Sequence, residues 1–285
     1  MSSLFMSNFP VEDTQRVGTP QPRLAILIDA DNADPAIIEG LLNEIAKYGV
    51  ASIKRIYGDW TDNRLRSWKE HLLNHGINPI QQFAYTTGKN ATDSAMIIDT
   101  MDLLYSEKLD GFCIVSSDSD FTRLASRLRE SGRVVYGFGK KQTPRSFVVA
   151  CDKFIYTEIL HDNQEGTEDK NTKSDGKTKS VVADTNPAAK SKGDFKKDKK
   201  LLKLLRDSVD DVADESGWAC LGPVGTNINN RLSDFDPRHY GFKKLSDMFK
   251  AISQFEIENV PSSNGSGKRL CVRWKNKQQT LNDSQ

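Results

Sequence analysis

The sequence has few cysteines, and they form no pattern. The four of them are far apart, with no CxxC pair and no Cys/His spacing that would suggest zinc: Cys113, Cys151, Cys220 and Cys271. In a chain of 285 residues, so few cysteines also argue against a disulfide framework. We therefore expect reduced thiols and a cytoplasmic protein.

Long apolar runs and an excess of one charge are missing as well. No run approaches the roughly 20 residues of a membrane-spanning helix. Residues 1–22 lack the basic and apolar regions of a signal peptide. We expect no membrane partner, and a flexible arm over residues 1–22. Because the formal net charge is only +1, a surface that binds nucleic acid would have to be local.

Short apolar segments alternate with helix-length amphipathic segments between residues 23 and 160. The strand-like segments are 23–29, 51–58, 77–83, 111–117, 133–139 and 153–157. After the first of them, Asp34 followed by Pro35 is typical of a helix start. Strands that alternate with helices indicate a parallel sheet covered on both faces. The sequence thus predicts an α/β fold with a doubly wound parallel sheet.

A second, smaller domain follows a break in the pattern. Residues 161–194 contain no aromatic side chain and no apolar periodicity, so we expect a disordered linker over 161–195. Amphipathic segments return at residue 196, and two strand-like segments, "FEIENV" and "RLCVRW", enclose a Gly/Ser-rich turn. Helices followed by such a hairpin predict a small winged-helix domain over 196–276, with a flexible tail at 277–285.

Aspartates stand where this fold would bring them together. Asp29 ends the first strand, Asp118 and Asp120 follow the fourth, and Asp93 lies in the first turn of a helix. In an open α/β sheet, ligands bind beyond the carboxyl ends of the strands, where the winding reverses. Carboxylates crowded there repel one another unless a divalent cation is bound, and Mg²⁺ or Mn²⁺ prefers such ligands. This pattern favours metal-assisted hydrolysis of a phosphodiester bond.

The same aspartates also have structural interpretations. Asp29 could form an Asx-turn that leads into the next helix. Asp118 could cap the helix that carries Asp120. Asp99 is a weaker candidate for the site, because it lies about 120° from Asp93 around their helix.

Two other activities fit the residues less well. The Asp29-x-Asp31 pair suggests a phosphatase of the haloacid dehalogenase type, but Ala33 stands where that family has Thr or Val. Dinucleotide binding is not supported, because no GxGxxG follows the first strand.

Three blocks resemble a known family. "LIDADN", "GKNATDSAMIID" and "VSSDSDFTRLASRLRESGRVVYGFG" resemble the signature blocks of the NYN domain, a PIN-like ribonuclease family, in its LabA-like branch. The resemblance covers the domain at 23–160 and implies a Mg²⁺- or Mn²⁺-dependent ribonuclease with sheet order 3-2-1-4-5. It implies metal-ligand roles for Asp29, Asp93 and Asp118, a more distal role for Asp120, and a supporting role for Asn32.

The second domain resembles the LOTUS (OST-HTH) winged-helix family. The resemblance rests on Trp218, on Gly222 to Gly225 and on "FDPRHYGFKKLSDMF". It implies RNA binding or docking of a protein partner. Basic residues placed for RNA contact are Lys89 before the predicted helix with Asp93, and Arg238, Lys243 and Lys244 in the second domain.

Two functions remain after these observations. The first is a metal-dependent endoribonuclease whose second domain recruits RNA. The alternative is a non-catalytic RNA-binding or scaffold protein that uses both domains. The complete set of aspartates favours the endoribonuclease.

Overall fold

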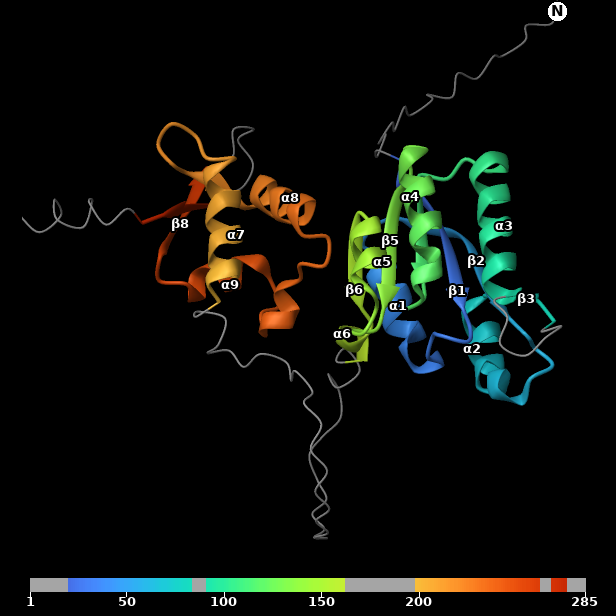
Figure 1. Ribbon diagram of the computed structural model, residues 1–285. Coiled ribbons are helices and arrows are strands. Elements are labelled where there is room, and N and C mark those ends of the chain that lie inside the picture. Colours follow the sequence, from blue (N-terminus) through green and yellow to red (C-terminus); the bar gives the residue numbers. More distant parts are fainter. Residues whose placement is uncertain (1–19, 84–90, 162–197, 262–267, 276–285) are drawn as a thin grey trace, which may run out of the picture.

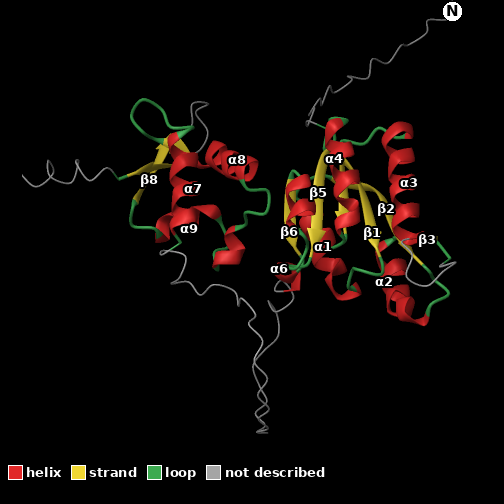
Figure 2. Cartoon of the chain, viewed as in Figure 1, coloured by secondary structure: helices red, strands yellow, loops and turns green. Residues whose placement is uncertain are grey.

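The structure is a computed structural model that describes residues 20–83, 91–161, 198–261 and 268–275 (Figures 1 and 2). Residues 1–19 of the expected arm, the expected tail and nearly all of the expected linker lie outside these ranges. Residues 20–22 of the expected arm are described, and the Pro22 carbonyl accepts a hydrogen bond of 2.8 Å from the Val50 amide. The described residues form a larger α/β domain and a smaller domain of helices and a three-stranded sheet.

The larger domain is built on a parallel sheet of six strands. Its strand order is β3-β2-β1-β4-β5-β6, and each neighbouring pair is parallel. The order 3-2-1-4-5 implied by the family resemblance is confirmed, with β6 added at one edge. The strands are β1 (Arg23–Asp29), β2 (Val50–Gly58), β3 (Asn78–Gln81), β4 (Gly111–Val115), β5 (Val134–Gly139) and β6 (Lys153–Tyr156).

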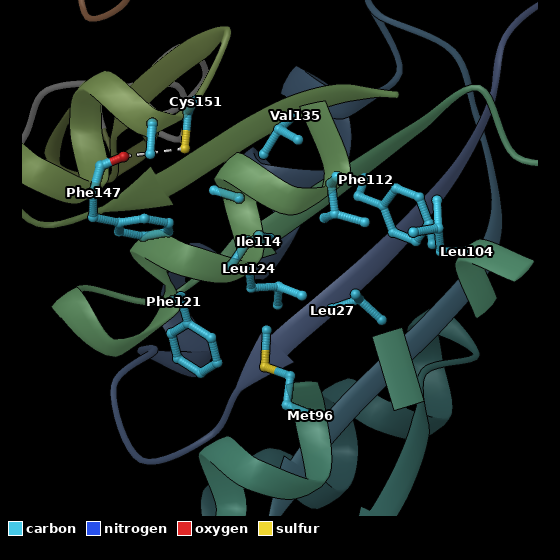
Figure 3. Packing of buried hydrophobic residues seen from close by; sticks show 14 of the residues in the cluster. Leu27, Met96, Leu104, Phe112, Ile114, Phe121, Leu124, Val135, Phe147 and Cys151 are labelled. Carbon is cyan, nitrogen blue, oxygen red and sulfur yellow. Dashed lines mark hydrogen bonds between the residues drawn. The ribbon is translucent and has the colours of Figure 1, made fainter. Parts of the chain in front are cut away.

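Helices cover both faces of this sheet, as the alternating pattern predicts. One core holds the inward side chains of α3 (Ala91–Ser106), α4 (Thr122–Glu130) and α5 (Arg145–Ala150). The other holds those of α1 (Ile38–Ile45), α2 (Trp68–His75) and α6 (Glu158–His161). Figure 3 shows part of the first core, where Leu27 of β1, Met96 of α3 and Leu124 of α4 come together.

The start of α1 follows the predicted signal. The side chain of Asp34 accepts a hydrogen bond of 2.9 Å from the Ala36 amide, and Pro35 opens a short 3-10 turn, Pro35–Ile37, that leads into the helix. An oxygen acceptor at this place satisfies an amide that the helix itself leaves unpaired.

The smaller domain has a core of its own. It comprises α7 (Lys199–Asp210), β7 (Ala219–Cys220), α8 (Leu221–Arg231), α9 (Leu245–Ala251), β8 (Phe255–Pro261) and β9 (Lys268–Trp274). The three strands form an antiparallel sheet in the order β7-β9-β8. Leu205, Val224, Phe249 and Val272 are buried together in its core. Three helices closed by an antiparallel hairpin agree with the predicted winged-helix domain.

None of the described helices is both long enough and apolar enough to cross a bilayer. All four cysteines are free, and Cys220 and Cys271 lie opposite each other on β7 and β9.

Candidate active site

The acidic residues lie at the carboxyl-terminal edge of the larger sheet, where the winding reverses. β1 pairs with β2 on one side and with β4 on the other, so the ends of β1 and β4 are neighbours. Asp29 is the last residue of β1, Asp118 follows β4, and Asp93 lies in the first turn of α3. This is the position at which open parallel sheets bind their ligands.

Three of the aspartates form a group that could hold a metal ion. Asp93, Asp118 and Asp120 each offer a carboxylate oxygen, and these oxygens lie within 4.8 Å of one another. Asp118 also caps the turn after β4, because it accepts a hydrogen bond of 2.9 Å from the Asp120 amide. Capping fixes the direction of that carboxylate, so the structural and the functional interpretations of Asp118 are compatible.

Asp29 is next to this group but is not a member of it among the described residues. It is 1% exposed. Its Oδ2 accepts hydrogen bonds from Asn32 Nδ2 at 2.6 Å and from Ser116 Oγ at 2.8 Å. Its Oδ1 accepts from the Asp31 amide at 3.1 Å. The last contact is the Asx-turn considered from the sequence, so Asp29 fixes the loop that adjoins the acidic group.

The charges in this region repel one another. Burial, together with the negative charges of Asp29, Asp118 and Asp120, raises the pKa of Asp93 to about 6. Burial also raises the pKa of Asp29, although hydrogen bonds from Ser116 and Asn32 oppose the shift. A cation among these oxygens would offset the repulsion.

The packing beneath the site fixes the elements that carry it. Phe121 and Met96 are fully buried in the same core, one after the turn with Asp118 and Asp120, the other in the second turn of α3. Figure 3 shows both side chains directed into this core. The two chain segments that supply the carboxylates are therefore anchored to the same apolar cluster.

The remaining candidates from the sequence have other surroundings. Asp99 pairs with Arg55 and accepts a hydrogen bond from the Tyr57 hydroxyl, so its contacts are within the fold. Asp31 is exposed. Lys89 lies outside the described residues.

The basic residues that the sequence suggests for RNA contact in the second domain differ in exposure and in ion pairing. Lys243 and Lys244 are exposed, immediately before α9. Arg238 instead directs its guanidinium at the carboxylates of Glu44 and Asp236. The structure thus brings Arg238 into contact with the larger domain and leaves the two lysines at the surface.

A cavity beside the Asp29 loop was not anticipated from the sequence. Its volume is about 210 Å³, and its polar lining includes Asn32, Ser116, Ser117 and Lys140. Ser116 and Ser117 line the cavity and directly precede Asp118, so the segment after β4 belongs to both the cavity and the acidic group. The only hint in the sequence is the pair of serines before Asp118 in "VSSD".

Comparison with known proteins gives a clear result at the level of domains. The NYN domain family matches residues 23–160, and the OST-HTH/LOTUS domain family matches residues 195–266. No curated protein matches the chain.

Two solved structures are similar to parts of the chain. A crystal structure of a protein of unknown function from Vibrio parahaemolyticus RIMD 2210633 has 17% identity and a TM-score of 0.42, and covers 49% of this chain and 94% of its own. A solution NMR structure of an uncharacterized protein from Nitrosomonas europaea has 26% identity and a TM-score of 0.25, and covers 39% of this chain and 94% of its own. At such TM-scores neither bears on function. The two domain matches agree with the observed fold: the chain contains an NYN domain over residues 23–160 and an OST-HTH/LOTUS domain over residues 195–266.

Proposed function

We propose that this protein is a metal-dependent endoribonuclease that hydrolyses RNA phosphodiester bonds with its NYN domain and recruits RNA with its OST-HTH/LOTUS domain. The observation that carries the proposal is the group of Asp93, Asp118 and Asp120, with carboxylate oxygens within 4.8 Å of one another. It lies at the sheet edge where ligands bind in this architecture. The nuclease-like character of NYN domains supports the same reaction.

The donor set fits Mg²⁺ or Mn²⁺. Three carboxylates offer hard oxygen ligands, and no histidine or cysteine belongs to the group among the described residues. The raised pKa of Asp93 supports the fit, because a bound cation would stabilise a carboxylate that burial and the neighbouring negative charges disfavour. A bound cation of this kind lowers the pKa of water and balances charge on phosphate oxygens.

The residues of the chain would divide the work. Asp93, Asp118 and Asp120 would hold the cation, whereas the sequence predicts Asp29 as a further ligand and Asp120 in a more distal role. Asp29 would stand behind them, where its charge adds to the field at the site and its hydrogen bonds hold Asn32 and Ser116 in place. Asp29 would therefore support the site in two ways: its charge would attract the cation, and its hydrogen bonds would hold the neighbouring loop in place.

RNA would be recruited by exposed cations of the second domain. Lys243 and Lys244 are exposed beside each other, and neither forms an ion pair that would compete with a phosphate among the described residues. Lys89, which precedes α3, remains a proposed phosphate contact from the sequence. Phosphate contacts of this kind supply affinity without sequence preference.

A cleavage assay tests the proposal. Labelled single-stranded and structured RNA is incubated with the full chain in Mn²⁺, in Mg²⁺ and in EDTA. We expect cleavage only with a divalent cation, and a loss of at least about 100-fold in Asp93→Asn and Asp118→Asn, because each removes a ligand charge. Asp102→Asn is the matched control, since Asp102 is an exposed aspartate on the same helix, α3.

The outcome also decides against the alternative. Equal cleavage in EDTA, or full activity in Asp118→Asn, would contradict the metal site. RNA binding without any cleavage would favour the non-catalytic RNA-binding or scaffold protein.

A further inference from the structure

The edge strand β6 is in contact with the second domain. β6 is the last strand of the parallel sheet, so its outer side has no partner within that sheet. The Phe154 amide on this side donates a hydrogen bond of 2.9 Å to the carbonyl of Ser233. Ser233 lies between α8 and α9, and its Oγ donates to the carbonyl of Val148 at 3.0 Å. The second domain thus satisfies backbone groups at an edge that natural proteins otherwise have to protect.

Side chains extend this contact toward the end of β6. Asp234 accepts a hydrogen bond of 2.9 Å from the Tyr156 hydroxyl and pairs with Arg145 at 2.9 Å. The rings of Tyr156 and His239 are 5.3 Å apart between centroids. One short segment of the second domain therefore meets both β6 and the start of α5.

An ion pair closes the other end of the contact. Arg238 donates from Nη1 and Nη2 to the two oxygens of Glu44, at 2.8 and 3.1 Å. The side chain of Glu44, near the end of α1, is 3% exposed, and its other partners are Lys47 and Tyr48. Asp236 holds the same guanidinium from within the second domain. A planar guanidinium that donates hydrogen bonds to two carboxylates has a fixed orientation, unlike a solvent-exposed ion pair.

We infer that the OST-HTH/LOTUS domain docks in cis on the β6 edge of the NYN domain, and that the Arg238–Glu44 pair holds it there. The occupant of the edge is the chain's own segment 233–239. Residues 162–197 are numerous enough to connect the two domains in one molecule, since an extended chain spans about 3.3 Å per residue.

Docking at this edge brings the second domain near the proposed site. The docking itself does not depend on catalysis. Only β5 separates β6 from β4, the strand that leads to Asp118. Neighbouring strands are about 4.8 Å apart, so the docked edge lies roughly 10 Å from that strand. Arg238 is then a positioning residue, and the exposed Lys243 and Lys244 remain for other partners.

Amide hydrogen exchange by NMR on the full chain tests the docking directly. The Phe154 amide reports the contact with Ser233, whereas the Thr157 amide donates at 2.9 Å to Gly139 inside the sheet and serves as the internal control. We expect slow exchange at both amides in the wild type. In Arg238→Ala, exchange at Phe154 should accelerate at least about 10-fold while Thr157 is unchanged, and Glu44→Gln should act in the same direction.

A control variant and a mass measurement complete the design. Lys250→Ala removes an exposed cation of α9 and should leave Phe154 protected. Fast exchange at Phe154 in the wild type, or no change in Arg238→Ala, would overturn the docking. Equal acceleration at Phe154 and Thr157 would also overturn it, since Arg238 would then stabilise the NYN fold as a whole. A dimer by light scattering that Arg238→Ala converts to monomer would show docking between copies instead.

Discussion

Asp29 ends one buried strand and Asp118 follows another, yet their carboxylates make different contacts. Asp29 is 1% exposed and accepts hydrogen bonds from the Asp31 amide, from Asn32 and from Ser116. Asp118 is half-buried and faces the other carboxylates of the acidic group. At the scale of the residue, the two aspartates should therefore respond differently to the same substitution.

We expect Asp29→Asn to destabilise the NYN domain without metal by about 1–3 kcal/mol. An amide has one acceptor oxygen, so either the Asp31 amide or the pair Asn32 and Ser116 would face an NH₂ group. Asp118→Asn should change the stability by less than about 0.5 kcal/mol, because it removes a like charge from a partly exposed group. Urea unfolding of both variants in EDTA checks the difference, and equal losses would contradict it.

Part of this site is predictable from the sequence. Asp93, Asp118 and Asp120 stand at helix starts and after a strand, and local position alone brings them to one edge of a parallel sheet. The contact of Ser116 with Asp29 is not predictable in this way, because the two are 87 positions apart and a serine has no charge to mark it.

At the scale of the element, α1 and α6 pack through Gly40. A Cβ at this position would lie 2.5 Å from the carbonyl oxygen of Leu160, which is backbone and cannot turn away. The glycine is thus required by a close approach of two helices rather than by its conformation.

We expect Gly40→Ala to lower the stability by about 1–3 kcal/mol, since the overlap outweighs the gain in helix propensity of up to about 1 kcal/mol. Gly222→Ala in α8 is the matched control, because a Cβ there meets nothing within 4 Å. That variant should be neutral or slightly more stable. Thermal unfolding of both variants measures the effect, and the same sign in both would be inconsistent with the packing.

The elements of the sheet follow from the sequence, whereas some helices do not. Each predicted strand is found, although β3 is shorter than the predicted segment 77–83; β1 and β4 are buried along nearly their whole length, as short apolar segments in a parallel sheet predict. The helix α2 (Trp68–His75) was not predicted, since Trp68 and Leu72 are its only buried residues in a polar segment. Two inward side chains are too few to give a clear helical period.

At the scale of the whole molecule, the contact between the domains has an ionic part that should respond to pH. Burial alone would raise the pKa of Glu44, but hydrogen bonds from Arg238, Lys47 and Tyr48 outweigh it and lower the pKa to about 2. A carboxylate with a lowered pKa contributes stability above its unfolded pKa, 4.5, and loses that contribution as the pH falls toward 2.

We therefore expect the wild type to be more stable than Glu44→Gln at pH 7, by an amount of the order of 3 kcal/mol or less. The difference should shrink between pH 4.5 and pH 2, because the wild-type carboxylate then takes up a proton. Denaturant unfolding of both proteins at several pH values tests this. A difference that stays constant down to pH 2 would mean that Glu44 stabilises the protein by packing alone.

This contact lay beyond prediction from the sequence. Arg238 stands near Lys243 and Lys244 in a basic stretch typical of nucleic-acid contact, and its partner Glu44 is 194 positions away. Two charged residues so far apart form no motif that could be recognised in the sequence. Only the fold reveals that Arg238 has a carboxylate partner in the other domain.

Arg238 is paired with carboxylates whereas Lys243 and Lys244 are exposed, and this difference predicts how RNA binding responds to salt. Each phosphate neutralised on a single strand contributes about 0.7 to the slope of log K against log salt concentration. If Lys243 and Lys244 contact phosphates, replacing both by alanine should reduce the slope by about 1.4. Arg238→Ala should leave the slope unchanged, because the guanidinium is paired with Glu44 and Asp236, even if loss of docking weakens binding. Fluorescence anisotropy with labelled RNA in EDTA, over a range of salt concentrations, measures both slopes. A reduced slope in Arg238→Ala would show that Arg238 leaves Glu44 to bind a phosphate in the complex.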